Sequence, residues 1–458
     1  MRIPVFLLVL FAGTLAPAGD AFGAASCQYT VRPVSVEPLS VNVAADCSGL
    51  DADGIRFVSA RSRAFADVES SGGGHLRYRF DIDGFVDSID EFRIAARRGD
   101  ARMLTLASWL GAPADAGPST RIAIRWSAAD RPVAFASVLP ESEDGFEIDV
   151  GDLRRAGYTV FGAYARRTIE VAAADGSGQA RIAVIDLRQA GPDLSRWIAD
   201  TATEVGRFYG RFPVANLLLV LLDGEGEGID YGRVVSGGGA TMLLVIGEAA
   251  SVPGLYGEWV LVHEMLHLGT PFMPRAFWFM EGFATYAEPI IRARAGWRSE
   301  RSVWNEFYRD MPRGLRALQE EGLSRTRSGM YWGGALFMLL ADLEYRRMNG
   351  GMRGLEHCMR GVLDELGDST VSGVVARVVD YCDSYFGAPV MANLSRRYVY
   401  DASPFDIASL WQRLGLHGSP GDVRLDDDAA DAALRSSIVR QAVGGAVEMN
   451  ENAPDSRQ

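Results

Sequence analysis

Two histidines stand four residues apart in "VLVHEMLHLGTPFMPRAFWFMEGFATYAEP", residues 260–289 of the chain. In a helix, residues i and i+4 lie one turn apart on the same face, so His263 and His267 point to one side. Two imidazoles at this spacing can hold one tetrahedral Zn²⁺. Glu264 is adjacent, and a carboxylate there can take a proton from water at the open side of the metal. Only five histidines occur in 458 residues, so this H-E-x-x-H match is rare by chance and predicts a zinc site.

A third protein ligand is needed, because a catalytic zinc site keeps its fourth position for water. Glu281 is the best candidate. Breaks at Gly269, Pro271 and Pro274 let the chain turn back, so that a second helix presents Glu281 to the first. Glu258, five residues before the motif, is the weaker alternative because it points away from the histidines.

Two further residues share the helix face of Glu281. Thr285 and Glu288 follow it at i+4 and i+7. From this position we expect them to accept hydrogen bonds from the imidazole N–H groups and so orient the two ligands.

The elements that position these residues are read from the hydrophobic period. Residues from Cys27 to about Leu187 mostly alternate apolar and polar side chains, which predicts strands, with a turn at residues 175–178. A helix is predicted from about Asp193 to Tyr209, followed by buried strands at 215–222 and 241–246. The Gly-rich stretch between those strands reads as irregular. Helices dominate after Tyr256, including 331–351, 352–366 and 370–386.

The predicted fold is therefore α+β, with a β-rich N-terminal domain, a zinc-binding catalytic domain and a helical C-terminal region. The predicted divisions are residues 1–25, a signal peptide; 26–188, the β-rich domain; 189–300, the catalytic domain; 301–425, the helical part of the catalytic unit; and 426–458, a terminal helix and a disordered tail.

The N-terminus indicates export. Arg2 is followed by a short apolar core over residues 4–15 and then by small residues, as in a bacterial signal peptide. The mature chain is predicted to be periplasmic or secreted, without stable membrane insertion. Export makes the four cysteines candidates for two local disulfides, Cys27 with Cys47 and Cys358 with Cys382.

The motif "HEMLH" followed by "WFMEGFATY" resembles the gluzincin zinc metallopeptidases. Within these it is similar to the glycyl aminopeptidase family and, more distantly, to the aminopeptidase N family. The resemblance implies a thermolysin-like catalytic domain. It also implies that Tyr331, which opens "YWGGALFMLLADLEYRR", stabilises the oxyanion. The acidic strand that anchors a substrate amine in these families has no match, because "SGGGATM" at 236–242 carries no acid.

We therefore predict an exported zinc metallopeptidase that acts on peptides or proteins with one Zn²⁺ held by His263, His267 and Glu281, and Glu264 and Tyr331 as catalytic residues. An aminopeptidase is favoured. An endopeptidase, a zinc hydrolase of non-peptide substrates and a non-catalytic peptide-binding protein are the alternatives. Glu225, Glu227 and Asp230 are candidates for the amine anchor of an aminopeptidase, and the alternative, which we favour, is that they form a solvated acidic loop. The net charge of −13 disfavours a nucleic-acid partner, and the sequence specifies no oligomeric state.

Overall fold

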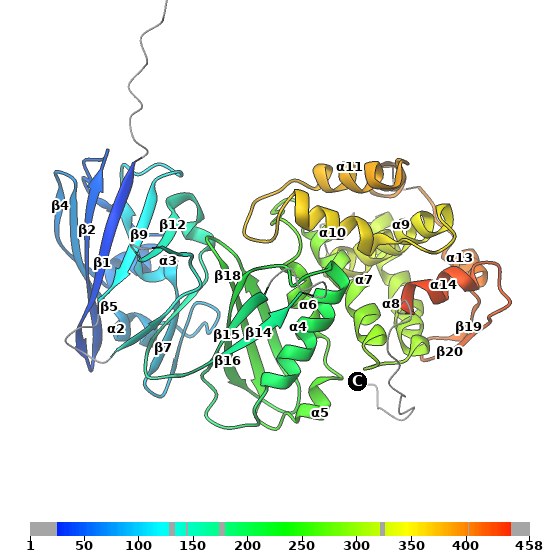
Figure 1. The fold of residues 1–458 in the computed structure, drawn as a ribbon, viewed down its shortest axis with the longest axis horizontal. Coiled ribbons are helices and arrows are strands. Elements are labelled where there is room, and N and C mark those ends of the chain that lie inside the picture. Colours follow the sequence, from blue (N-terminus) through cyan, green and yellow to red (C-terminus); the bar gives the residue numbers. More distant parts are fainter. Residues whose placement is uncertain are drawn as a thin grey trace, which may run out of the picture.

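The computed structural model describes residues 25–127, 133–142, 145–173, 179–320, 326–401 and 403–440. Three predictions fall outside these residues: the signal peptide, the turn at 175–178 and the terminal tail. The α+β fold predicted from the sequence is confirmed, since sheets occupy the N-terminal half and helices the C-terminal half (Figure 1).

The N-terminal part contains two sheets that pack on each other. Within the described residues the larger sheet has the order β11-β12-β9-β1-β2-β5-β4 and the smaller one β10-β13-β7-β6. Among the described strands of these two sheets, only β1 and β9 run parallel. The larger sheet consists of β1 (Ser26–Val36), β2 (Leu39–Ser48), β4 (Ala66–Gly72), β5 (His75–Asp81), β9 (Arg121–Trp126), β11 (Glu141–Ser142) and β12 (Gly145–Asp149). The smaller consists of β6 (Ala95–Arg98), β7 (Ala101–Thr105), β10 (Ala134–Ala136) and β13 (Tyr158–Gly162).

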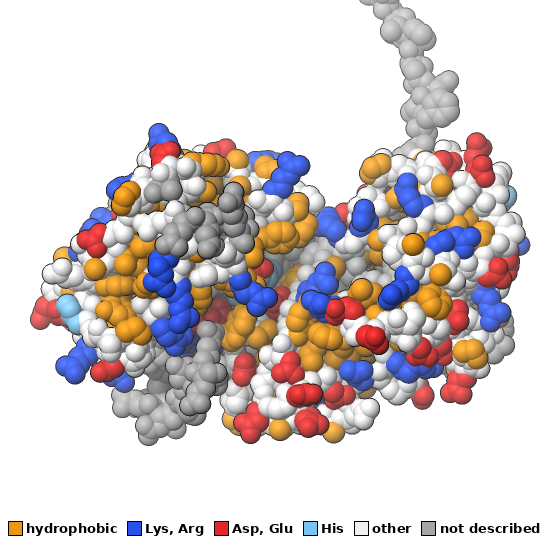
Figure 2. Space-filling view, turned by 180° about the vertical axis from the view of Figure 1, so that it is seen from behind, with side chains coloured by type: hydrophobic (Ala, Val, Ile, Leu, Met, Phe, Trp, Pro, Cys, Tyr) orange, Lys and Arg blue, Asp and Glu red, His pale blue; other side chains and the backbone are white. Residues whose placement is uncertain are grey.

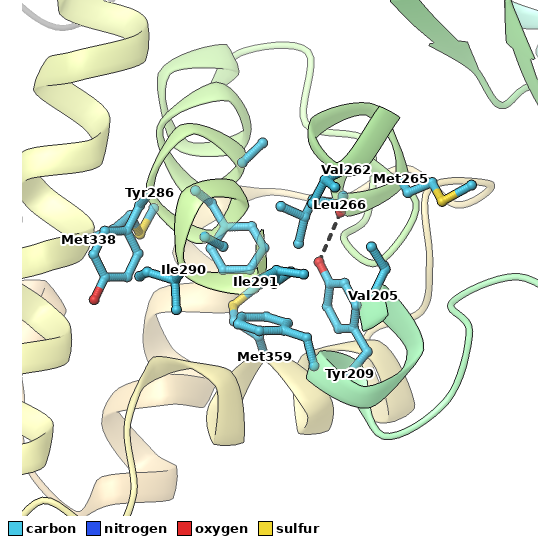
Figure 3. Packing of buried hydrophobic residues seen from close by; sticks show 14 of the residues in the cluster. Val205, Tyr209, Val262, Met265, Leu266, Tyr286, Ile290, Ile291, Met338 and Met359 are labelled. Atoms are coloured by element: carbon cyan, nitrogen blue, oxygen red, sulfur yellow. Dashed lines mark hydrogen bonds between the residues drawn. The ribbon is translucent and has the colours of Figure 1, made fainter. Parts of the chain in front are cut away.

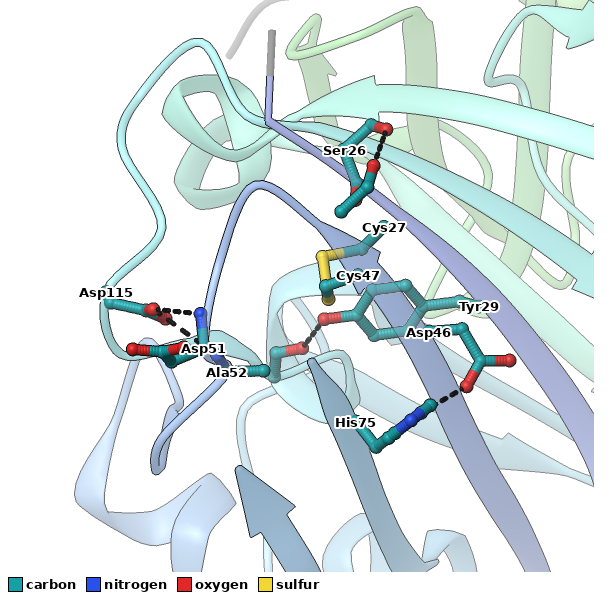
Figure 4. Close-up of a disulfide and its surroundings, with 11 residues drawn as sticks. Ser26, Cys27, Tyr29, Asp46, Cys47, Asp51, Ala52, His75 and Asp115 are labelled. Carbon is teal, nitrogen blue, oxygen red and sulfur yellow. Dashed lines mark hydrogen bonds and ion pairs between the residues drawn. A yellow bond between two sulfur atoms is a disulfide. The ribbon is translucent and has the colours of Figure 1, made fainter. Parts of the chain in front are cut away.

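A buried cluster joins the two sheets, and a disulfide ties the larger one. Tyr29 and Val43 of the larger sheet and Phe161 of the smaller belong to one apolar core. Cys27 and Cys47 are directly opposite in β1 and β2 and form the predicted disulfide (Figure 4). Short elements connect the strands: β3 (Ile55–Arg56), β8 (Ala112–Pro113), α1 (Ala60–Ala64), α2 (Ile82–Asp87), α3 (Leu106–Trp109) and η1 (Val150–Arg155).

A third sheet, in the order β14-β15-β16-β18-β17, follows the two N-terminal sheets along the chain. Its strands are β14 (Ala165–Ala172), β15 (Gln179–Asp186), β16 (Asn216–Gly224), β17 (Ile229–Val235) and β18 (Ala240–Gly247). Alternate residues of β16 pack on opposite sides, Leu219 against the helices and Val220 against the smaller N-terminal sheet. Burial on both faces explains the continuous apolar run of this strand.

Two predictions from the sequence differ from the observed composition of this third sheet. The hairpin at 165–186, grouped with the β-rich domain, pairs with β16 in the third sheet, because alternation predicts a strand but not the sheet that it joins. The Gly-rich stretch expected to be irregular contains β17, an antiparallel edge strand paired with β18. The β-forming residues Ile229, Tyr231 and Val235 outweigh its glycines.

Helices cover one face of the third sheet and, together with the short hairpin β19–β20, form the rest of the described chain (Figure 1). The second predicted disulfide, Cys358–Cys382, joins α10 to α11. None of the described helices is long and apolar enough to cross a membrane. The elements are α4 (Ser195–Tyr209), α5 (Val252–Leu255), α6 (Val260–His267), α7 (Phe277–Arg294), α8 (Glu300–Glu320), η2 (Gly329–Gly333), α9 (Gly334–Met348), α10 (Leu355–Glu365), α11 (Val375–Phe386), α12 (Val390–Leu394), η3 (Ser395–Tyr400), α13 (Ile407–Arg413), β19 (Leu416–Ser419), β20 (Asp422–Leu425) and α14 (Ala432–Val439).

Candidate metal centre

Helix α6 carries both histidines and packs against α4. Val262, Met265 and Leu266 of α6 belong to the buried core. The hydroxyl of Tyr209 donates a hydrogen bond of 2.9 Å to the carbonyl oxygen of Leu266 (Figure 3). This contact fixes the end of α6 next to His267, so the position of that imidazole depends on packing as well as on helix geometry.

Helix α7 brings Glu281 to the two imidazoles. Oε2 of Glu281 lies 3.1 Å from Nε2 of His263 and 3.5 Å from Nε2 of His267. The next residue, Gly282, packs on the backbone of α9, where an added Cβ would stand 2.4 Å from the carbonyl carbon of Gly334. This glycine allows the two helices to approach closely.

The three side chains form a plausible set of zinc ligands. Their donor atoms, two imidazole nitrogens and one carboxylate oxygen, all lie within 4.8 Å of one another. Ligand bonds of about 2.1 Å in a tetrahedral zinc site separate neighbouring donors by roughly 3.4 Å. The two measured N–O distances are close to that separation. The set therefore fits one Zn²⁺.

The charges of these groups are strongly coupled. Burial acts to lower the pKa of His267, but the Glu281 carboxylate raises it to about 9, with a smaller contribution from Glu264. Burial acts to raise the pKa of Glu281, while the charges and hydrogen bonds of both histidines hold it well below its ordinary value. The carboxylate thus favours positive charge at the point where the three side chains meet, and a divalent cation supplies that charge when the imidazoles are neutral.

Glu264 lies beside this group and belongs to a different set of contacts. Its carboxylate oxygens are not among the three converging ligand atoms, which belong to His263, His267 and Glu281. Burial raises the pKa of Glu264, His267 and His263 lower it, and a backbone hydrogen bond at Val234 also lowers it. Gly232, two residues before Val234 in β17, packs against its side chain. The edge strand therefore positions this carboxylate.

Tyr331 lies next to His263. It belongs to the π-helical turn η2 that precedes α9. Its ring is nearly parallel to that of His263, with centroids 5.9 Å apart and an interplanar angle of 7°. Burial raises the pKa of Tyr331, and the charge of Glu281 and a hydrogen bond to it act in the same direction. Tyr331 is therefore a protonated donor at the site.

Thr285 and Glu288 do not orient the histidines as expected. The hydroxyl oxygen of Thr285 is buried and has no hydrogen-bond partner in the described part of the chain. Glu288 pairs with Arg292 one turn later on α7, at 2.7 Å, and Arg292 donates to the carbonyl oxygen of Gly257. Thr285 and Glu288 lie on the same face of α7, but Arg292 on the same helix pairs with the Glu288 carboxylate. Glu258 is not a member of the converging group.

The structure also shows the surroundings of the residues that are candidates for binding the ammonium group of a substrate. Oδ2 of Asp230 accepts a hydrogen bond of 2.8 Å from the backbone N–H of Glu225, so Asp230 folds the loop before β17. Residues 236–242 stand in the sequence where the families that it resembles have their anchoring strand. In the structure they form the connection between β17 and β18 and the start of β18, and they are not part of the edge strand. Gly232 and Val234 are the site residues that sequence reasoning missed. A glycine within a run of strand-forming residues is the signal that could have identified the close approach.

The fold resembles that of M1 zinc metallopeptidases of known structure. An aminopeptidase N family protein from Idiomarina loihiensis matches with a TM-score of 0.61 and 12% identity, over 86% of this chain and 78% of that chain. An M1 zinc metallopeptidase from Deinococcus radiodurans matches with a TM-score of 0.51 and 16% identity, over 84% and 94%. A mutant of that metallopeptidase bound to a Tyr-Ser-Ala substrate has the same TM-score and identity. No protein-family model and no curated protein matches the chain. At these identities the likeness concerns the fold.

Proposed function

We propose that this protein is a zinc-dependent metallopeptidase, with one Zn²⁺ held by His263, His267 and Glu281. The observation that supports this most directly is the convergence of those three side chains on one point, with Glu264 and Tyr331 close to them. The likeness to M1 zinc metallopeptidases is independent support, because it comes from the whole fold rather than from the motif. The finer similarity to the glycyl aminopeptidase family rests on the sequence motifs alone.

The residues divide the chemistry of peptide hydrolysis between them. A bound zinc ion polarises the scissile carbonyl and lowers the pKa of water. Glu264 takes a proton from the attacking water and passes it to the leaving amine; its raised pKa brings the carboxyl closer to the working pH of a general base. The hydroxyl of Tyr331 donates to the oxyanion, where a fixed donor contributes most to catalysis.

The first experiment measures metal and activity together. We expect about one Zn²⁺ per chain in the purified protein, peptide hydrolysis that stops on chelation and returns with zinc, and no bound zinc in a folded His263→Ala/His267→Ala double variant. Full zinc content in the double variant would refute the ligand assignment. Full zinc content in the wild type without peptide turnover would favour a non-peptide substrate or a binding function.

The edge strand β17 bears on the choice between aminopeptidase and endopeptidase. An edge strand offers backbone groups to an extended peptide. Residues 231–235 of β17 include no carboxylate, and Asp230 is engaged with Glu225. An aminopeptidase needs a carboxylate that faces the substrate ammonium, because a buried unpaired ammonium is costly. We favour the aminopeptidase because of the fold likeness. The engagement of Asp230, the acid on β17, with the backbone of Glu225 supports the endopeptidase as the second candidate.

A matched pair of peptides, one with a free N-terminus and one acetylated, separates these two activities. Cleavage of the free peptide alone would support the aminopeptidase. Glu225→Gln and Glu227→Gln should then raise KM for that peptide if either residue is the anchor. Equal cleavage of both peptides would establish the endopeptidase.

We also propose that the protein functions outside the cytoplasm, in the periplasm or the medium. The two disulfides support this, since such bonds persist in oxidising compartments. Fractionation of the native host, with N-terminal sequencing of the mature chain, tests the location and the predicted removal of residues 1–25.

A further inference from the structure

A second cavity lies away from the metal centre, among the helices of the C-terminal half. Its volume is about 580 Å³, within the range of small-molecule sites. It is bounded by α4, the end of α7, the end of α9, the start of α10 and the end of α14. Arg294 follows Glu281 on α7 by more than three turns, a rise of about 20 Å. The cavity is therefore separate from the candidate metal site.

The floor of the cavity is a buried and internally paired cluster. Nη2 of Arg346 lies 2.7 Å from Oε2 of Glu356, and its Nε lies 3.1 Å from Oδ1 of Asp342. Arg294 adds a contact of 3.2 Å to Glu356. Burial acts to raise the pKa of Glu356, but the charges of Arg294 and Arg346 lower it to about 2. These charges hold one another in place and give the cavity a rigid base.

The rim carries three further arginines, Arg207, Arg360 and Arg440, and among them only Arg207 pairs with a described carboxylate. Arg360 donates to the carbonyl oxygens of Phe208 at 2.7 Å and Arg207 at 2.9 Å, so backbone rather than a carboxylate fixes its guanidinium. Arg440 forms no ion pair with any described residue. Arg207 pairs with Glu204. Within the described residues, five arginines around the cavity face three carboxylates, those of Glu204, Glu356 and Asp342.

His357 adds a neutral donor to this rim. Its Nδ1 accepts a hydrogen bond from the backbone N–H of Gly354 at 3.2 Å. Burial lowers the pKa of His357; Glu356 opposes this, and the nearby Arg360 and Arg346 lower it further. The ring is therefore neutral, with its proton on Nε2, and can donate a hydrogen bond without adding charge.

We propose that this cavity binds a small organic anion that carries a carboxylate or phosphate group on an apolar body. Arg207, Arg360 and Arg440 supply charged donors, which bind both groups well. Phe208, Ile291 and Met352 supply an apolar wall. The described lining carries more positive than negative charge although the whole chain has a net charge of −13, so the cavity attracts anions. The site is independent of zinc and of peptide hydrolysis.

Titration calorimetry on the full chain tests the proposal, with inorganic phosphate and N-acetyl-leucine as anionic probes and N-acetyl-leucinamide as the neutral control. We expect one molecule of an anionic probe per chain and no binding of the amide. Tighter binding of phosphate assigns a phosphate-bearing ligand, and tighter binding of N-acetyl-leucine assigns a carboxylate.

The matched variants are Arg207→Gln/Arg440→Gln, which removes two rim charges, and Arg377→Gln, which removes an exposed helical charge on α11. Loss of two charge-assisted contacts, at roughly tenfold per contact, should weaken binding by about 100-fold, with zinc content unchanged. The Arg377→Gln variant should bind as the wild type does. Equal affinity in the double variant and the wild type, or no binding of either anion, would overturn the proposal.

Discussion

Gly232 in β17 packs directly on Glu264 in α6. A Cβ built on Gly232 would stand 2.7 Å from Cγ of Glu264 and 2.5 Å from Cγ1 of Val260. Such contacts are too short for real atoms, so any side chain at this position must displace the carboxylate or the helix. The distance between the edge strand and α6 is therefore set by a residue without a side chain.

The first prediction follows from this contact. Gly232→Ala should reduce peptide hydrolysis on the order of 100-fold, because displacement of a catalytic group by about 1 Å has that effect. Zinc content should be unchanged, since the three ligands lie on α6 and α7. The matched control is Gly117→Ala, where an added Cβ meets nothing within 4 Å. Equal activity of Gly232→Ala and Gly117→Ala would show that the contact does not position Glu264.

A second prediction separates the general base from the ligands. Glu264→Gln should retain zinc, because Glu264 is not one of the converging side chains. Hydrolysis should fall by about 10²–10⁴, the usual contribution of a general base. Metal analysis and peptide turnover on the same preparation measure both effects. If Glu264→Gln loses zinc and Glu281→Gln keeps it, the two residues have exchanged roles.

The sequence predicted those parts of the site that depend on local geometry. Helical spacing relates His263 to His267, and chain breaks allow Glu281 to return to them. The disulfides were predictable because each joins elements close in sequence. By contrast, the contact of Gly232 with Glu264 joins a strand to a helix, and its distance depends on the packing of the whole sheet.

The sequence also did not predict which of several possible partners a buried side chain contacts. Glu288 was expected to orient an imidazole, but Arg292 lies one turn away on the same helix and pairs with it. Spacing identifies which side chains share a face, not which of several partners each one selects. The same limit applies to Arg346 and Glu356, whose pairing depends on how α9 meets α10.

The third prediction concerns the disulfide between α10 and α11. Cys358 and Cys382 are fully buried and 24 residues apart. Replacing both with alanine should lower the free energy of unfolding by about 3.5 kcal/mol, the loop-closure value for this length. Urea unfolding of the variant and the wild type measures the difference. Because the variant lacks this bond, a reductant should not lower its stability by breaking it. An unchanged urea midpoint would show that packing alone holds the two helices together.

The fourth prediction uses the lowered pKa of Glu356. Its folded-state pKa is about 2, whereas an unfolded glutamate titrates near 4.3. The stabilisation by this carboxylate is therefore present above the unfolded pKa and is lost as pH falls towards the folded pKa. Between about pH 5 and pH 2, the wild type should lose stability more steeply than Glu356→Gln, although the variant is less stable at pH 7.

Urea unfolding at a series of pH values tests this difference in slope. Glu365→Gln is the control, because Glu365 is an exposed carboxylate on the same helix. Its acid dependence should follow that of the wild type. Parallel curves for Glu356→Gln and the wild type would contradict the role assigned to the ion pairs with Arg294 and Arg346.

The last prediction concerns Tyr331, whose role rests on its position beside His263. The parallel ring contact at 5.9 Å fixes the aromatic ring, and Tyr331→Phe preserves that ring while removing the hydroxyl. Zinc binding and KM should therefore change little. If the hydroxyl donates to the oxyanion, kcat should fall by about 10²–10³, as for other single oxyanion donors. Tyr385→Phe removes an exposed hydroxyl and should leave kcat unchanged. A fall in zinc content without a fall in the activity per bound zinc would instead show that Tyr331 serves the metal site by its hydrogen bond to Glu281.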